Sequence, residues 1–271
     1  MPRIDPRVIA HYETHDQTDR LHATATGRLE LTRTQHLLRR HLPPAPARVL
    51  DVGGGPGIHA RWLTDQGYTV HLIDPVPHHL TQAAAHANCT TELGDARRLT
   101  APDNSHDAAL LLGPLYHLPD RHDRITALQE AQRVVRPGGL IAAAAISRYS
   151  LLQDHGTVTS LTDEDVRRRL GTRLAGGYQP EPDADPTGLF TAAHFHTGDE
   201  LLAEATEAGL TDAVLHGIEG PAWAILKGIE RHTGEFPGDL FAMALEAAHL
   251  ADPHPATADM SAHMLLLATR G

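Results

Sequence analysis

The residues best suited to chemistry follow a short apolar segment near position 50. Residues 48–52 read RVLDV and lead into Gly53-Gly54-Gly55-Pro56-Gly57, and a second apolar segment ends on Asp74. Glycines after a buried strand let the backbone approach a ligand, and the next helix offers its free N–H groups. Asp74 lies 19 residues after Gly55, close to the spacing at which an acid meets the ribose of a nucleotide. The pattern predicts a nucleoside-binding turn.

Two details of this region favour an adenosine without phosphates. The dinucleotide fingerprint G-x-G-x-x-G fails, because its third glycine would fall at Ile58. Asp95 follows the third apolar segment, where its carboxylate could accept a hydrogen bond from an adenine amino group. Cradles for di- and triphosphates usually recruit a lysine, and the only lysine of the chain, Lys227, is distant in sequence.

These residues need a sheet whose strand ends meet at one edge. Very apolar segments alternate with amphipathic ones, which is typical of a parallel sheet covered by helices on both faces. Strands are expected at residues 48–52, 68–74, 90–93, 106–112, 140–146, 211–218 and 262–269. Helices are expected before residue 43 and at residues 59–66, 76–87, 123–135, 163–170 and 198–208, with a loop at 176–188.

Composition excludes several classes of protein. The chain has 271 residues, enough for a substantial core, and its single cysteine excludes an internal disulfide or a cysteine-held iron–sulfur cluster. A net charge of −11 without a long basic run argues against binding to nucleic acid. No apolar stretch is long enough for a membrane span or a signal peptide. We therefore expect a cytoplasmic protein with no membrane and no nucleic-acid partner.

Five segments resemble, in order and spacing, the class I S-adenosylmethionine-dependent methyltransferases. They are VLDVGGGPG (residues 49–57), LIDP (72–75), GDA (94–96), DAALLLGPLYHL (107–118) and RVVRPGGL (133–140). The resemblance covers about residues 45–147. It implies an α/β fold: a Rossmann-like, seven-stranded, mostly parallel sheet with an antiparallel last strand, helices on both faces and a helical cap. It also implies S-adenosyl-L-methionine as cofactor and no metal.

The same resemblance divides the chain into four parts. An N-terminal helical cap would occupy residues 1–43, and the cofactor-binding core residues 44–147. Residues 148–197 would form a cap or insert over the acceptor site, and residues 198–271 the remainder of the core sheet.

The cofactor contacts that the resemblance implies run from the methionine end of the ligand to its adenine. The methionine would lie against the glycines and Asp51, the ribose on Asp74, and the sulfonium over the end of the fourth strand. A weaker resemblance of both ends of the chain to bacterial small-molecule members adds two candidates for the cofactor carboxylate, Tyr12 and Arg28. The full set is Tyr12, Arg28, Asp51, Gly53, Gly55, Gly57, Asp74, Pro75, Asp95, Ala96, Leu112 and Gly113.

Methyl transfer from a sulfonium is an in-line displacement, in which alignment, exclusion of water and removal of the acceptor's proton do most of the catalysis. His117 is the candidate base, because an unperturbed imidazole titrates near neutrality. The alternative is that it only packs beneath the cofactor. The candidate catalytic residues are His117, Tyr116 and Tyr12, and the candidate acceptor-binding residues are Tyr116, His117, Arg148, Tyr149, Glu219 and Trp223. Lid packing is the alternative for the last four, and His194 with His196 has metal-pair spacing without an evident third ligand.

The two ends of the chain look like bacterial members that often come from natural-product pathways. We therefore expect transfer of a methyl group to nitrogen, carbon or oxygen of a small heteroaromatic (indole-like) or amine metabolite. Three alternatives remain open: an NAD-dependent reductase, a protein that binds S-adenosylmethionine without catalysis, and a tRNA or protein methyltransferase.

Overall fold

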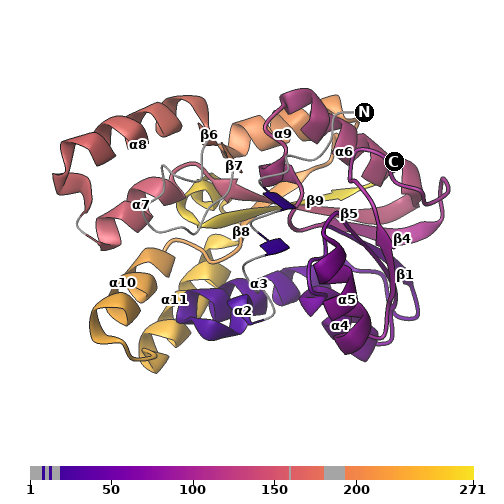
Figure 1. Cartoon of the computed structure of the whole chain (residues 1–271), viewed down its shortest axis with the longest axis horizontal. Coiled ribbons are helices and arrows are strands. Elements are labelled where there is room, and N and C mark those ends of the chain that lie inside the picture. The colour runs from indigo at the N-terminus through magenta and orange to yellow at the C-terminus, as the bar shows by residue number, and fades with distance from the viewer. Residues whose placement is uncertain (1–7, 10–11, 14–18, 159, 180–192) are drawn as a thin grey trace.

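The computed structural model describes residues 8–9, 12–13, 19–158, 160–179 and 193–271. At its centre, five strands pair in parallel in the order β3-β2-β1-β4-β5 (Figure 1). They are β1 Arg48–Val52, β2 Thr69–Asp74, β3 Thr90–Leu93, β4 His106–Leu111 and β5 Val135–Ser147. β9 (His263–Thr269) runs antiparallel to β5, and β8 (Val214–Gly217) antiparallel to β9. The predicted fold is confirmed.

Two short strands extend this sheet beyond the seven expected ones. β7 (Ala193–His196) pairs in parallel with the end of β5, and β6 (Tyr178–Gln179) pairs antiparallel with β7. Between them lie residues 180–192, so most of the predicted loop at 176–188 falls outside the described residues. The division into cap, core and insert stays a prediction.

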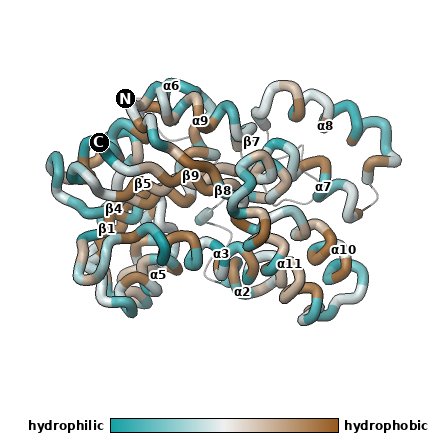
Figure 2. The backbone as a smooth tube through the Cα atoms, turned by 180° about the vertical axis from the view of Figure 1, so that it is seen from behind, coloured by the Kyte–Doolittle hydropathy of each residue, from teal (hydrophilic) through white to brown (hydrophobic). Residues whose placement is uncertain are grey.

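Helices cover both faces of the sheet because successive strand residues point to opposite faces. Leu110 of β4 packs with α3 (Ala25–His41), α4 (Ile58–Asp65) and α5 (Pro77–His86). Its neighbour Leu111 packs with α6 (Arg121–Val134) and α9 (Gly198–Glu207) on the other face. The strands accordingly form the hydrophobic centre of the molecule in Figure 2.

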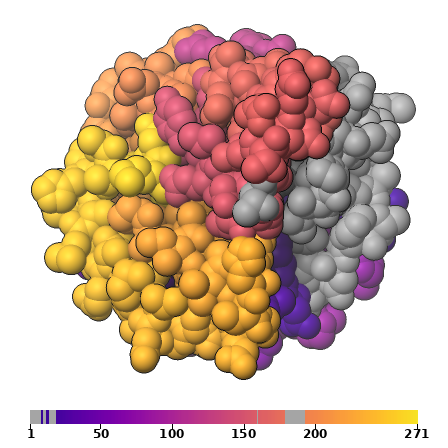
Figure 3. Space-filling model, turned by 90° about the vertical axis from the view of Figure 1, so that its left-hand side faces the viewer, coloured from indigo at the N-terminus to yellow at the C-terminus, as the bar shows by residue number. Residues whose placement is uncertain are grey.

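A second group of helices lies beyond the strand edge that carries the glycine turn. α10 (Trp223–Thr233) and α11 (Gly238–Ala251) pack with the start of α3 around Leu29 and Leu226, and α2 (Arg20–Ala23) contacts α3. α7 (Ser150–Thr157) contacts α10, and α8 (Glu164–Gly176) follows α7. These helices form one end of the molecule (Figures 1 and 3). No helix within the described part of the chain is long and apolar enough to cross a membrane.

A buried ion pair joins α3 to the end of α11. Arg33 is fully buried, its Nε donates to the carbonyl of Ile218 at 3.1 Å, and its guanidinium pairs with Asp252. Arg40, two turns further along the same face of α3, reaches the same carboxylate from the surface at 2.9 Å and has a side chain that is 56% exposed. The pair therefore fixes α3 against the segment that follows β8.

We expect Arg33→Met to lower the free energy of unfolding by about 3 kcal/mol, because Asp252 keeps a largely desolvated charge without its buried partner. Arg40→Met removes a solvent-screened contact to the same carboxylate and should cost less than about 1 kcal/mol. Urea unfolding followed by tryptophan fluorescence measures both values. Equal losses in the two variants would contradict a buried role for Arg33.

Candidate functional site

A cavity lies where the ends of the parallel strands meet. It contains about 1300 Å³ of space free of atoms, including its open mouth. Its walls come from the turns that follow β1, β2 and β3, from η1 (Leu115–His117) after β4, from α2 and α3, and from the start of β9. Clefts at this edge of a parallel sheet are the usual ligand sites of such folds.

The structure brings most of the predicted site residues to this cavity. The predicted residues that line it are Tyr12, Asp51, Gly53, Gly55, Asp74, Pro75, Asp95, Ala96, Leu112, Gly113, Tyr116 and His117. They come from five separate segments of the chain, so the sheet topology, rather than proximity in sequence, assembles them.

Two predicted cofactor residues lie elsewhere. Gly57 is the N-cap residue of α4 and has a φ of 86°; a Cβ there would come within 3.0 Å of the Cβ of Ala83, so this glycine lets α4 pack on α5. Arg28 donates from Nε to the carbonyl of His22 at 2.9 Å, and its guanidinium lies over the ring of Phe236. The guanidinium that lines the cavity is that of Arg20 instead.

Of the remaining acceptor-site candidates, none lines the cavity. The buried Arg148 donates to the carbonyl of Phe195 and pairs with Glu200. Trp223 is 2% exposed and donates from Nε1 to the carbonyl of Met260 at 3.0 Å, which is the loop-anchoring alternative. Tyr149 is 44% exposed on the surface, and Glu219 is buried behind the cavity wall.

The buried pair of histidines on β7 is likewise outside the cavity. His196 contacts Glu204 at 3.2 Å, and Glu204 also accepts from Arg124, whose guanidinium donates to the carbonyls of Leu118 and Pro119. This network supports the segment that follows η1 from behind. The prediction that the chain needs no metal stays a prediction.

Asp74 locks the glycine turn in place. Its Oδ2 accepts from the backbone N–H of Gly55 at 2.9 Å. Its Oδ1 accepts from the backbone N–H of Val76 at 2.9 Å and lies 3.1 Å from Nδ1 of His79. Gly55 has a φ of 56°, and a Cβ there would meet no atom closer than 3.9 Å, so its backbone faces open space.

Asp51, near the end of β1, has no such support. It is 1% exposed, and its Oδ2 has no hydrogen-bond partner among the described residues. Burial, reinforced by the nearby charge of Asp74, raises the pKa of Asp51 to about 7. A buried carboxylate that faces a cavity without a partner is suited to receive a cation.

Tyr12 joins two walls of the cavity. Its hydroxyl lies 2.8 Å from Nε2 of His117, and its ring meets the rings of His79 and His117 edge-on. Burial raises the pKa of Tyr12 above its ordinary value and that of Tyr116 to about 12, so both are neutral phenols. Tyr12 thus connects α5 to η1.

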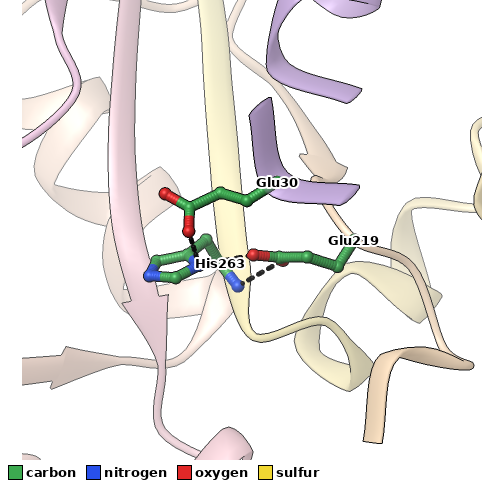
Figure 4. Close-up of side chains that lie close together, drawn as sticks. All are labelled: Glu30, Glu219 and His263. Carbon is green, nitrogen blue, oxygen red and sulfur yellow. Dashed lines mark hydrogen bonds and ion pairs between the residues drawn. The ribbon is translucent and has the colours of Figure 1, made fainter. Parts of the chain in front are cut away.

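A polar cluster that was not predicted as a unit occupies another wall. Arg20 donates to Oε1 of Glu30 at 2.8 Å and to Oε2 at 3.1 Å, and the same Oε2 lies 4.0 Å from Nδ1 of His263. Nδ1 of His263 is 2.6 Å from Oε1 of Glu219 (Figure 4). Glu219 Oε2 accepts from Ser261 Oγ at 2.7 Å and from the backbone N–H of His263 at 2.9 Å.

The charges of this cluster are paired with one another. Burial alone would raise the pKa of Glu30, but Arg20 and His263 outweigh it and lower this pKa to about 2. Burial alone would lower the pKa of His263, and the carboxylates of Glu219 and Glu30 raise it instead. The carboxylate oxygens and Nδ1 already have partners, so we treat the cluster as a hydrogen-bonded network and not as a metal site.

Residues 49–139 match a protein-family model described as a methyltransferase domain. An uncharacterized methyltransferase of Mycobacterium tuberculosis is 32% identical over 48% of this chain and 53% of its own length. Methyltransferase GfsG of Streptomyces halstedii is 32% identical over 46% of each chain. The chain thus spans about half the length of these curated relatives. The predicted family resemblance is confirmed for the core.

Solved structures agree with the fold. An S-adenosylmethionine-dependent methyltransferase from Mesorhizobium loti superposes with a TM-score of 0.56 at 18% identity, over 89% of this chain and all of the other. The [4+2]-cyclase SpnF superposes with a TM-score of 0.54 at 18% identity, over 98% of this chain and 92% of its own. One fold therefore carries different reactions, and the reaction has to be argued from the site.

We expect Asp51→Asn to stabilise the ligand-free protein more at about pH 8 than at about pH 5. Since the folded-state pKa of Asp51 is raised, the folded state binds the extra proton, and stability falls as pH rises from the unfolded value of about 4 towards about 7. Asparagine cannot ionise, so this fall should be smaller in the variant.

Urea unfolding at the two pH values measures the difference in free energy of unfolding between Asp51→Asn and the wild type. We expect this difference to be larger at about pH 8 by at least about 1 kcal/mol. Asp65→Asn, at an exposed position at the end of α4, is the control and should show no such growth. A constant difference for Asp51→Asn would show that this carboxylate is not strained in the folded state.

Proposed function

We propose that this chain, whose residues 49–139 are a methyltransferase domain of the class I S-adenosylmethionine-dependent type, transfers a methyl group from S-adenosylmethionine to a small acceptor. The observation that carries the proposal is the convergence of the open glycine turn, Asp74, Asp95 and the unpartnered Asp51 on one cavity. The similarity of the core to a methyltransferase domain supports S-adenosylmethionine as the cofactor, and the cavity supports its position at the strand ends.

The cofactor would lie across the ends of β1, β2 and β3. Asp74 already accepts backbone hydrogen bonds and has lone pairs left for the ribose hydroxyls. Asp95, held by Arg97 at 2.6 Å, would meet the adenine edge with Ala96. Asp51 would receive the ammonium group, and Arg20 replaces Arg28 as the candidate for the carboxylate. The sulfonium would then face Leu112 and Gly113.

Charge separates this cofactor from NAD. Asp51, Asp74 and Asp95 all line the cavity, so a pyrophosphate would bring two negative charges towards three carboxylates. S-adenosylmethionine brings a sulfonium and an ammonium group instead. The alternative of an NAD-dependent reductase is therefore disfavoured on electrostatic grounds.

Methyl transfer needs no covalent bond between the protein and either substrate. A lone pair of the acceptor attacks the methyl carbon, and the electrons of the breaking carbon–sulfur bond stay on sulfur, leaving neutral S-adenosylhomocysteine. The protein has to align the acceptor with the sulfonium, exclude water and accept any proton released. Tyr12 would close the cavity over the cofactor by linking α5 to η1.

A small metabolite in the cytoplasm is the acceptor we favour, heteroaromatic or amine-bearing and from a natural-product pathway. The volume of about 1300 Å³, which includes the open mouth of the cavity, supports a small second ligand beside the cofactor. The net charge of −11 disfavours tRNA as the acceptor. The second candidate function is binding of S-adenosylmethionine without methyl transfer. In that case the protein would form no S-adenosylhomocysteine with any small acceptor.

We expect S-adenosylhomocysteine to bind the wild-type protein in calorimetry and NADH not to bind. Asp74→Ala should weaken S-adenosylhomocysteine about 10- to 100-fold, because a hydrogen bond to a charged group is worth roughly 1.5–3 kcal/mol. Asp103→Ala, an exposed carboxylate ahead of β4 at the opposite edge of the sheet, should leave affinity unchanged. Tighter binding of NADH than of S-adenosylhomocysteine would overturn the proposed function.

The contact between Tyr12 and His117 gives a test of closure that needs no acceptor. If it holds the cavity shut, Tyr12→Phe and His117→Ala should each weaken S-adenosylhomocysteine, and the double variant should lose less than the sum of both. If His117 is the catalytic base, His117→Ala should instead lower turnover and leave affinity intact. Additive losses in affinity would contradict a shared role in closure.

A further inference from the structure

His263 also lines this cavity, and its outer nitrogen, Nε2, makes no hydrogen bond to another described side chain. We propose that His263 is the general base that removes the acceptor's proton during methyl transfer, and that Glu219 is the positioning residue that orients it. This inference rests on the proposed function and concerns its acceptor side.

Glu219 fixes the orientation of the His263 ring. Its Oε1 lies 2.6 Å from Nδ1, while its Oε2 accepts from Ser261 Oγ and from the backbone N–H of His263. Ser261 Oγ in turn accepts from the backbone N–H groups of Glu219 and Gly220. A carboxylate that accepts at Nδ1 places the proton of the neutral imidazole there and leaves the lone pair on Nε2. This is the arrangement by which a carboxylate orients a histidine base in hydrolases.

The free nitrogen is accessible from the cavity. Figure 4 shows that Nε2 points away from both Glu30 and Glu219. His263 lines the cavity with a side chain that is 21% exposed. Nε2 has no hydrogen bond to any described residue, yet it is not among the fully enclosed polar atoms that lack a partner. A substrate atom could therefore approach it.

Strand order places His263 on the acceptor side. The residues proposed for the cofactor follow β1, β2 and β3, whereas His263 begins β9, two strands beyond β4. Ala144 of β5 and Ile218 after β8 line the cavity next to it. The sulfonium over Leu112 and Gly113 would lie between the two regions. His117, the base predicted from the sequence, has its Nε2 engaged by Tyr12 at 2.8 Å.

The charged groups that face His263 suit a residue that gains a proton. They are Glu219 after β8, Glu30 on α3 and Arg20 on α2, and Arg20 is bonded to Glu30. With His263 protonated, two acids and two cations balance. Glu219 and Glu30 also raise the pKa of His263, so the proton is held once taken.

The step balances as follows. The acceptor X–H loses its proton to Nε2, its electron pair forms the X–CH3 bond, and the electrons of the carbon–sulfur bond remain on the sulfur of S-adenosylhomocysteine. With His263 neutral, this wall carries Glu30 and Glu219 against Arg20, and a proton taken from the acceptor balances these charges. An acceptor with a weakly acidic hydroxyl or ring N–H is therefore the class that this site fits.

The first experiment is an NMR titration of His263 in complexes with S-adenosylmethionine and S-adenosylhomocysteine, with the resonance assigned from His263→Gln. A sulfonium near the ring disfavours the imidazolium, so we expect the pKa of His263 to be lower by about 1 unit with S-adenosylmethionine. His249 on α11, away from the cavity, is the internal control and should not differ between complexes. Equal pKa values for His263 would place it away from the methyl group and overturn the proposal.

Two variants separate the roles. Glu219→Gln should lower the pKa of His263 in both complexes, and Glu246→Gln, an exposed acid on α11, should not. An unchanged pKa in Glu219→Gln would remove the positioning role. If the wild-type protein binds neither S-adenosylmethionine nor S-adenosylhomocysteine in calorimetry, the proposed function itself is overturned.

The second experiment compares methylation of phenol and 4-nitrophenol at about pH 8, where only the latter is largely ionised. His263→Gln should slow methylation of phenol at least about 10-fold more than that of 4-nitrophenol, since a base is needed only for the former. Equal slowing would overturn the role as base. Failure of the wild-type protein to methylate either compound, with S-adenosylmethionine bound, would overturn the acceptor class.

Discussion

The carboxylate of Asp74 is the contact on which the rest of the site depends. It ends β2, accepts from the glycine turn after β1 at Gly55, and lies against His79 on α5. Burial of a carboxylate is costly, and these hydrogen bonds offset the cost. Because one side chain joins three elements, the turn is already shaped before a ligand arrives. A ribose would meet a fixed acceptor and would not have to order a loop.

Asp51, on the neighbouring strand β1, is buried without the hydrogen bonds that Asp74 receives. Its burial is not compensated within the described protein, and its raised pKa records the cost. Such strain persists where the fold over-determines it, and here β1 and its parallel neighbours do so. An ammonium group of a ligand would pair with the Asp51 carboxylate. Removing the unfavourable burial of this charge would then contribute to the free energy of ligand binding.

The sequence predicts the central sheet well because its signals are local. The strands β1, β2 and β4 and the second half of β5 are apolar runs, and the glycines and Asp74 mark where a ligand would meet the sheet. The helices α10 and α11 were not predicted, since the chain there was expected only to complete the sheet. Arg28 was chosen among several N-terminal arginines. α3 begins at Ala25 under the cap of Thr24, and within this helix Arg28 turns towards Phe236.

The cluster of Arg20, Glu30 and His263 had no sequence signal at all. Its members are more than 200 residues apart at the extremes, and only the pairing of β9 with β5 brings them together. Glu219 was selected for its place at a strand end, but as a lining residue. It is instead the carboxylate behind His263. Its position in the sequence placed Glu219 near the acceptor side of the cavity. Only the hydrogen bonds of the structure show that it contacts His263 and does not line the cavity itself.

The two ends of the cavity differ in how their charges are balanced. Where the cofactor would lie, neither Asp51 nor Asp74 is paired with an arginine among the described residues. Beyond them, towards β9, Glu30 pairs with Arg20, and Glu219 is hydrogen-bonded to His263. Acids without an arginine favour a ligand that brings cations, whereas a neutral His263 beside Glu30 and Glu219 favours a ligand that gives up a proton. One cavity would thereby sort a cationic methyl donor from an uncharged acceptor, and each would be held where its methyl or its proton can leave.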